Sequence, residues 1–162
     1  MKRIVALLLL VACVFSLASC AVLPIYNSTD VIYILKNAGY TITYVDESVQ
    51  EGIIAYIYGN NSETGDEIYY IYCENLKSAN SIYEYISSKQ KAKIAEIKMK
   101  IDKVEYALYK SEGISAAEKG DYYRQYVELT EALEEIENYT CGRGFNLVWY
   151  GTKKAVSDIK KG

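Results

Sequence analysis

The sequence predicts an α+β fold, with a mainly antiparallel sheet of about four strands packed against helices and a long antiparallel helical hairpin before the last strand. Two observations predict this arrangement. Short segments rich in β-branched and aromatic residues lie before and after one long stretch whose apolar residues recur every three or four positions. The first strands also follow one another without the intervening helices that a parallel sheet requires.

The segment before the long stretch predicts one helix and three strands. A helix is expected over residues 29–38, capped by Ser28 or Thr29 and ended by Gly39. An alternating pattern predicts a strand over 40–45. Two further strands, over 53–58 and 67–73, are joined by a polar turn that contains glycine, which is typical of a β-hairpin. These two strands are apolar or aromatic at nearly every position, so helices should cover one face of the sheet and leave the other partly wet.

The long stretch, residues 75–139, predicts the helical hairpin. Ser87 and Ser88 indicate a bend in its first helix, and Gly113 indicates the break between the two helices. The first helix is rich in lysine and the second in glutamate, so we expect ion pairs across the hairpin. The apolar stripes, which resemble the seam of a coiled coil, consist of Ile94, Ile97, Ile101, Val104 and Leu108 in the first helix and of Tyr122, Tyr126, Leu129, Leu133 and Ile136 in the second.

The end of the chain predicts one more strand and one more helix. Gly142, Arg143 and Gly144 are interpreted as a turn that leads into a strand over 145–150. Gly151 then turns the chain into a last helix that Thr152 caps, with two lysines near its C-terminal end, where cations favour the helix dipole.

The first twenty residues have the pattern of a secretory signal. Lys2 and Arg3 precede an apolar run from Ile4 to Phe15, and small or apolar residues continue to Ser19. The run is shorter than the ~20 apolar residues that a membrane-spanning helix needs. Leu17-Ala18-Ser19-Cys20 resembles the lipobox of bacterial lipoproteins, and this resemblance covers residues 1–20 only. The alternative is an ordinary signal peptide with a chance cysteine.

The lipoprotein resemblance implies a domain plan and a location. Residues 1–19 would be the signal peptide, and Cys20 would carry the lipid and become the new N-terminus. Residues 20–28 would form a lipidated tether, and residues 29–162 a single α+β domain on the extracytoplasmic side of the cell membrane. Two acyl chains on Cys20 would suffice for stable anchoring, whereas one gives only marginal binding. The domain itself resembles no family.

Composition excludes several classes of function. Without Lys2 and Arg3 the chain has 16 basic and 21 acidic residues, a net charge of −5, which argues against binding of nucleic acid. The chain contains no histidine, so the commonest general base and the commonest metal ligand are both missing. No glycine-rich turn lies between a predicted strand and helix, as a nucleotide site would require. We therefore predict no catalytic residues, no metal and no cofactor.

Cysteines and tyrosines supply the remaining candidate residues. Cys73 and Cys141 either form a disulfide, which an extracytoplasmic location permits, or remain two buried thiols. Among the 18 tyrosines, Tyr56, Tyr58, Tyr70 and Tyr72 are expected to share one face of the hairpin of strands. These four would either pack beneath a helix or form a platform that stacks on sugars or on another protein.

These observations favour a non-enzymatic, membrane-anchored lipoprotein that either acts through protein contacts, with an unidentified envelope protein as its partner, or serves as an envelope component. The alternative is a lipoprotein that binds a small ligand or a glycan on the tyrosine-rich sheet face. A third and weaker interpretation is a carboxylate-based hydrolase that uses acids at strand ends, among them Glu47, Glu51 and Glu74.

Overall fold

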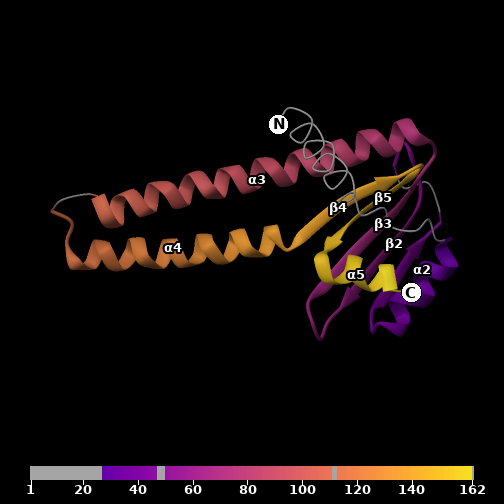
Figure 1. The fold of residues 1–162 in the computed structure, drawn as a ribbon, viewed down its shortest axis with the longest axis horizontal. Coiled ribbons are helices and arrows are strands. Elements are labelled where there is room, and N and C mark those ends of the chain that lie inside the picture. The colour runs from indigo at the N-terminus through magenta and orange to yellow at the C-terminus, as the bar shows by residue number, and fades with distance from the viewer. Residues whose placement is uncertain (1–26, 47–49, 111–112, 162) are drawn as a thin grey trace, which may run out of the picture.

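The fold is that of a computed structural model, which describes residues 27–46, 50–110 and 113–161. It confirms the predicted α+β class, and its sheet has five strands, one more than expected. In chain order the elements are α2 (Ser28–Asn37), β1 (Thr41–Val45), β2 (Ile53–Asn61), β3 (Asp66–Cys73), α3 (Leu76–Lys110), α4 (Ala116–Glu137), β4 (Tyr139–Gly144), β5 (Leu147–Thr152) and α5 (Lys153–Lys161) (Figure 1).

The sheet is antiparallel throughout, with the strand order β1-β2-β3-β5-β4. The last strand, β5, therefore lies between β3 and β4, and Tyr69 of β3 pairs with Tyr150 of β5. Helix α2 begins at Ser28 rather than at residue 29, because the side chain of Asn27 caps it by accepting a hydrogen bond from the Asp30 amide. Gly39 follows α2 with a φ of +87°, a backbone conformation that favours glycine.

Strand β4 occupies the segment that the sequence analysis interpreted as a turn. Gly142 lies within this strand and pairs with Trp149, whose indole ring occupies the space that a side chain at position 142 would fill. The turn between β4 and β5 consists instead of Phe145 and Asn146, and Phe145 has a φ of +51°. Glycine inside the strand and phenylalanine in the turn reverse the usual preferences of both positions, so the prediction of a turn at Gly142–Gly144 was wrong.

Helices α2 and α5 cover one face of the sheet and form the main hydrophobic core with it. Tyr70, Ile57 and Trp149 point into this core from three strands. Leu35 of α2 and Ile159 of α5 are fully buried against them. Each fully buried aliphatic or aromatic side chain contributes about 1.5–3 kcal/mol, so this cluster is the main source of stability.

The first turns of α3 cover part of the other face. Ala79 of α3 is buried together with Cys73 of β3 and Val148 of β5. Three partly buried side chains of the same helix, Ile82, Tyr83 and Ile86, extend this contact. The rest of this face, over β1 and β2, carries half-buried and exposed side chains, as the predicted one-sided cover requires.

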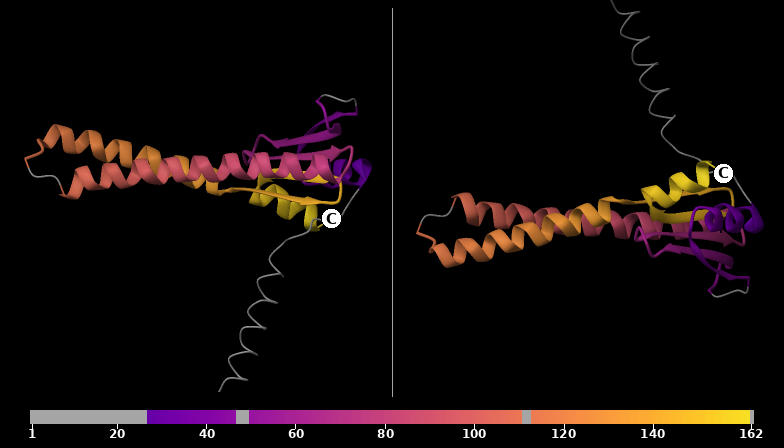
Figure 2. Two further views of the ribbon diagram at one scale, coloured as in Figure 1. Left: turned by 90° about the horizontal axis from the view of Figure 1, so that it is seen from above. Right: turned by 90° about the horizontal axis from the view of Figure 1, so that it is seen from below.

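Beyond the sheet, α3 and α4 form the predicted hairpin, which extends far from the sheet in all the views (Figures 1 and 2). Asn75 caps α3 by accepting a hydrogen bond from the Ser78 amide, and a capping box of Ser115 and Glu118 begins α4. At about 1.5 Å per residue, the 35 residues of α3 span about 52 Å. The helix is continuous through Ser87 and Ser88, so the bend predicted there was wrong.

The two helices meet along the predicted apolar seam. Ile97 and Val104 of α3 are buried there, whereas the stripe of α4, from Tyr122 to Ile136, is only half-buried. At the base of the hairpin, the Gln90 side chain donates hydrogen bonds to the carbonyl oxygens of Ile136 and Tyr139. Among the described residues, Lys98 and Glu137 make the one ion pair between the helices, at 2.9 Å.

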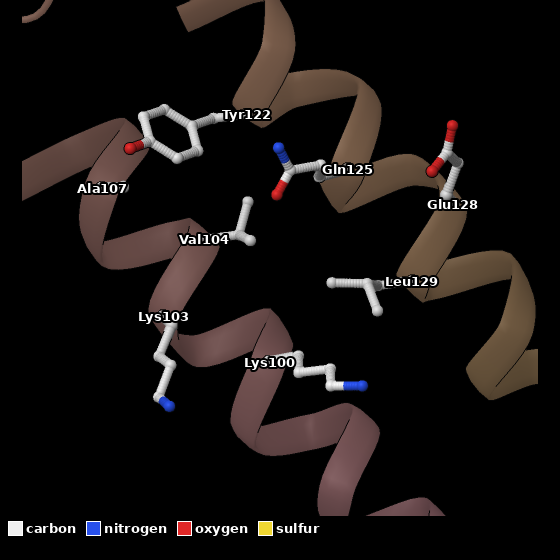
Figure 3. A pocket seen from close by; sticks show the side chains of 8 residues that line it. All are labelled: Lys100, Lys103, Val104, Ala107, Tyr122, Gln125, Glu128 and Leu129. Atoms are coloured by element: carbon white, nitrogen blue, oxygen red, sulfur yellow. The ribbon is translucent and has the colours of Figure 1, made fainter. Parts of the chain in front are cut away.

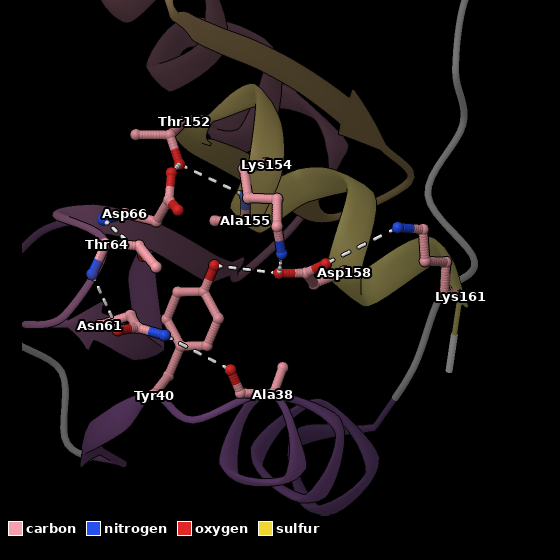
Figure 4. Close-up of polar contacts among 10 residues, drawn as sticks. All are labelled: Ala38, Tyr40, Asn61, Thr64, Asp66, Thr152, Lys154, Ala155, Asp158 and Lys161. Atoms are coloured by element: carbon pink, nitrogen blue, oxygen red, sulfur yellow. Dashed lines mark hydrogen bonds and ion pairs between the residues drawn. The ribbon is translucent and has the colours of Figure 1, made fainter.

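A polar cluster holds α5 and α2 against the tip of the β2–β3 hairpin (Figure 4). The Thr152 hydroxyl donates to the Asp66 carboxylate at 2.7 Å and accepts from the Ala155 amide, so it also caps α5 as predicted. The Tyr40 hydroxyl donates to the Asp158 carboxylate at 3.2 Å, and Lys154 pairs with the same carboxylate. Among the described residues no buried polar side-chain atom lacks a partner, so this cluster is structural.

The packing of Trp149 over Gly142 predicts that one added methyl group at position 142 lowers the free energy of unfolding. We expect Gly142→Ala to lower the free energy of unfolding by about 1–3 kcal/mol, because the new side chain would overlap the buried indole ring. The matched control is Gly120→Ala, at an exposed position of α4 with open space around it, which should raise the free energy by about 0.5–1 kcal/mol. Urea unfolding followed by circular dichroism measures both, and a Gly142→Ala variant as stable as the wild type would contradict the packing.

Candidate functional site

The four tyrosines predicted to share a face lie on opposite faces of the sheet. Tyr56 and Tyr58 pair with Ile71 and Tyr69, whereas Tyr70 pairs with Ile57. The turn between β2 and β3 has four residues, 62–65. Along most of the ladder, an even-numbered residue of one strand therefore pairs with an odd-numbered residue of the other. Because successive side chains of a strand alternate between faces, the even-numbered tyrosines of the two strands separate, and the prediction of one shared face was wrong.

The two separated pairs have different environments. Tyr70 is fully buried in the core beneath α2 and α5, and its ring meets that of Tyr72 edge-on, with centroids 5.5 Å apart. This pair follows the predicted alternative of packing beneath a helix. Tyr56 and Tyr58 lie on the other face and remain half-exposed beside β1.

Five tyrosines lie on the partly open face, four of them close to Glu67, and we call this group the tyrosine face. It consists of Tyr56, Tyr58, Tyr69, Tyr139 and Tyr150. The Tyr58 hydroxyl donates to one oxygen of the Glu67 carboxylate at 2.9 Å, and the Tyr139 hydroxyl donates to the other at 2.7 Å. Tyr139 and Tyr150 are in strands whose position beside β3 has no signal in the sequence, so their place in this group was not predicted.

Four rings of this group form two close pairs beside the carboxylate, one tilted and one stacked. Tyr58 and Tyr69 have centroids 4.6 Å apart, and Tyr139 and Tyr150 have centroids 5.1 Å apart with planes 25° from parallel. Burial, the hydrogen bond to Glu67 and its charge raise the pKa of Tyr139 well above its usual value, and burial first of all raises the pKa of Tyr69 and Tyr150. These phenols therefore stay neutral in the physiological range and act as hydrogen-bond donors and stacking surfaces.

The two cysteines are free thiols on strands that are not adjacent. Cys73 is buried at the end of β3, and Cys141 is half-buried in β4, with β5 between them. Tyr69 and Cys141 both pair with Tyr150, so Cys141 is level with Tyr69 across the sheet. Cys73 lies four residues further along β3 than Tyr69. Strand spacing and rise then separate the two Cα atoms by roughly 16 Å, whereas a disulfide needs less than 7 Å. The disulfide alternative is therefore excluded in this fold, and burial raises the pKa of the Cys73 thiol to about 11.

A groove of about 560 Å³ lies between α3 and α4 on one side of the hairpin, and we call it the hairpin groove (Figure 3). Val104 and Leu129 point into it from the two helices. Lys100 and Lys103 lie along the α3 side, and Glu128 lies on the α4 side. Its full lining is Lys100, Lys103, Val104, Ala107, Tyr122, Gln125, Glu128 and Leu129. No part of the sequence analysis predicted a groove here, because the two apolar stripes by themselves indicate only a closed seam.

Three tyrosines near the far end of the hairpin are exposed to solvent, and we call them the tip tyrosines. Tyr106 and Tyr109 of α3 are 66% and 72% exposed, and Tyr123 of α4 is 59% exposed. At these positions the three tyrosines leave more than half of their surface in contact with solvent. Such residues are enriched in the contact surfaces of protein complexes.

The remaining predicted positions add no site. Cys20 and the tether residues before Asn27 lie outside the described residues, as does Glu47. Glu51 and Glu74 are exposed at the ends of β2 and β3. Within the described part of the chain, no three acidic or cysteine side chains are grouped closely enough to hold a metal ion, and no helix has the length and apolar character to cross a membrane.

The chain matches no known protein family, and it has no match among curated proteins or solved structures. We therefore infer function from the tyrosine face, the hairpin groove and the tip tyrosines.

The contact between Tyr139 and Glu67 predicts a pH-dependent contribution to stability. The pKa of Tyr139 is raised in the folded state, whereas unfolded tyrosine ionises near pH 10. A group whose folded pKa is raised stabilises the fold fully below the unfolded pKa and loses this contribution as the pH rises towards the folded pKa. We therefore expect Tyr139→Phe to cost about 1 kcal/mol at pH 8 and to weaken the loss of stability above pH 10.

Urea unfolding between pH 8 and pH 11.5 measures this effect. The matched control is Tyr109→Phe, which removes a hydroxyl from an exposed side chain and should change stability by a few tenths of a kcal/mol at most. Equal pH profiles for the Tyr139→Phe variant and the wild type would show that the hydrogen bond to Glu67 does not stabilise the fold.

Proposed function

We propose that the protein is a lipid-anchored, non-enzymatic component of the bacterial cell envelope that uses its helical hairpin to bind another protein. The observation that carries this proposal is the position of the tip tyrosines. They lie at the end of a hairpin that extends away from the sheet, whereas α2, where the described chain begins, lies at the opposite end (Figure 1).

The length of the tether determines which end of the domain lies close to the membrane. Seven residue steps separate Cys20 from Asn27, and an extended chain covers at most about 25 Å over that length. A lipid on Cys20 would therefore hold the α2 end close to the membrane surface. The hairpin, whose longer helix spans about 52 Å, is then free to reach away from the membrane.

Chemistry at the described sites favours binding over catalysis. Both oxygens of Glu67 accept hydrogen bonds from tyrosines, and the chain has no histidine to serve as a general base. The net charge of −5 without Lys2 and Arg3 favours a protein partner over nucleic acid. Exposed tyrosines supply large contact areas at a low cost in side-chain entropy, which suits recognition of a protein surface.

The second candidate function is binding of a glycan or another small polar ligand on the tyrosine face. The specific observation that favours it is the two tyrosine ring pairs beside Glu67, which together offer aromatic surfaces and hydrogen-bonding groups on a half-open sheet face. This site lies at the base of the molecule and not at the hairpin tip, so single substitutions separate the two functions.

Affinity capture from solubilised membranes tests the proposal. We expect the full chain to retain a specific partner, and Tyr106→Ala combined with Tyr109→Ala to lower the captured amount at least tenfold, because exposed aromatic anchors commonly contribute 2 kcal/mol or more. The matched control combines Tyr33→Ala and Tyr85→Ala, at positions 67% and 64% exposed on α2 and on the base of α3.

The outcomes separate the two candidate functions. Capture that is lost with the tip substitutions and kept in the control supports the hairpin function. Capture that is lost only with Tyr69→Ala, in a complex that soluble glycan competes away, would assign binding to the tyrosine face instead. No specific partner under repeated conditions, with every variant alike, would overturn the proposal.

A further inference from the structure

The two helices of the hairpin carry opposite net charges, and few ion pairs join one helix to the other. Helix α3 has eight lysines and four acidic residues, a net charge of +4, and α4 has two basic and seven acidic residues, a net charge of −5. Lys98 and Glu137 make the one ion pair between the helices within the described residues. The other ion pairs of the hairpin lie within a single helix, as for Lys100 with Glu96.

The side of the hairpin that carries the groove shows the strongest separation. Lys100 and Lys103 form its α3 rim, and Glu128 lies on its α4 rim. Residues seven positions apart lie on the same side of a helix, so Lys93 and Glu96 extend the α3 row, in which Glu96 pairs with Lys93 and Lys100. By the same spacing, Asp121 and Glu135 extend the α4 row. This side therefore presents a row of three lysines and one glutamate on α3 beside a row of carboxylates on α4, with an apolar floor between them.

The α4 side of the groove floor is partly exposed to solvent. No residue of α4 is buried, although its apolar stripe faces α3, because one helix alone cannot enclose the stripe of another. The distal part of the hairpin lies clear of the sheet in all the views, so nothing in the described chain blocks this side (Figures 1 and 2). Two further helices would complete a four-helix core over the half-buried Leu129, beside the buried Val104.

We propose that the occupant of the hairpin groove is the hairpin of a second copy of this chain. The two copies pack groove to groove around a twofold axis parallel to the hairpin, so that α3 of each copy lies on α4 of the other. The lysine row of each copy then faces the carboxylate row of its partner. This proposal deepens the proposed function and rests on it only for the membrane in which both copies would be anchored.

Charge selects this arrangement among the twofold alternatives. An axis across the hairpin would place α3 on α3 and α4 on α4, which brings lysines against lysines and carboxylates against carboxylates. An axis along the hairpin brings opposite charges together at both contacts. It also leaves both α2 ends on the same side, as two tethers in one membrane require.

Native mass spectrometry of the full chain released from detergent tests the proposal, because it counts chains directly. We expect a dimer for the wild type. We expect Lys100→Glu with Lys103→Glu, and separately Glu128→Lys with Glu135→Lys, each to weaken the dimer by about tenfold or more, since each puts like charges at both contacts. Mixing the two variants should restore a dimer that contains one chain of each kind.

The fully exchanged chain and a matched control complete the design. All four substitutions in one chain should restore a homodimer, because α3 then carries the acids and α4 the lysines. The control, Lys77→Glu with Lys91→Glu, makes the same change in net charge on the opposite side of α3 and should dimerise like the wild type. Circular dichroism checks that every variant is folded.

The results separate this proposal from the proposed function. A wild-type chain that is monomeric at every concentration overturns the second-copy proposal, and so does a dimer that the groove substitutions leave unchanged. A partner captured through the tip tyrosines would still support the proposed function in either case. A charge-dependent dimer with no partner captured would support self-association alone.

Discussion

The apolar seam between α3 and α4 is the contact on which the shape of this protein depends. The two helices bury Ile97 and Val104 between them and leave the α4 stripe half-exposed. Most of the stability of a helix in a protein comes from the packing of its apolar face rather than from intrinsic propensity. The seam therefore keeps the hairpin extended, and its incomplete burial leaves an apolar surface for further association.

The sheet supplies the base for that seam. Helix α3 is fixed to the sheet by Ala79, Ile82 and Ile86 before it reaches the distal part of the hairpin. The Gln90 side chain of α3 donates hydrogen bonds to backbone carbonyl oxygens at the junction of α4 and β4, so it holds the end of α4 against α3. The core between the sheet and the helices α2 and α5 then holds this base rigid, with the polar cluster around Asp66 and Asp158 closing its edge (Figure 4).

The sequence predicted the helical elements well because their evidence is local. The spacing from Ile94 to Leu108 repeats over several turns, Ser115 and Glu118 form a capping box, and Thr152 caps the last helix. Ser87 and Ser88 failed as indicators of a bend because serine is tolerated in a helix whose neighbouring residues pack on a sheet.

The features that were not predicted depend on contacts distant in the sequence. Gly142 lies in a strand because Trp149 fills the space beside it, and no local pattern shows that pairing. The division of the tyrosines between two faces follows from the length of the β2–β3 turn, and a change of one residue in that register would reverse it. Tyr139 reaches Glu67 from 72 positions away along the chain, so the tyrosine face becomes visible only in the folded sheet.

Hydrogen–deuterium exchange of the full chain at a series of protein concentrations tests most directly whether the distal hairpin is held by its seam and covered by association. The account predicts that the backbone amides of residues 94–110 and 116–137 exchange faster than those of β3 and β5 in dilute protein, and slow down as the concentration rises while the sheet stays unchanged. Distal amides that are as slow as the sheet at every concentration would contradict it.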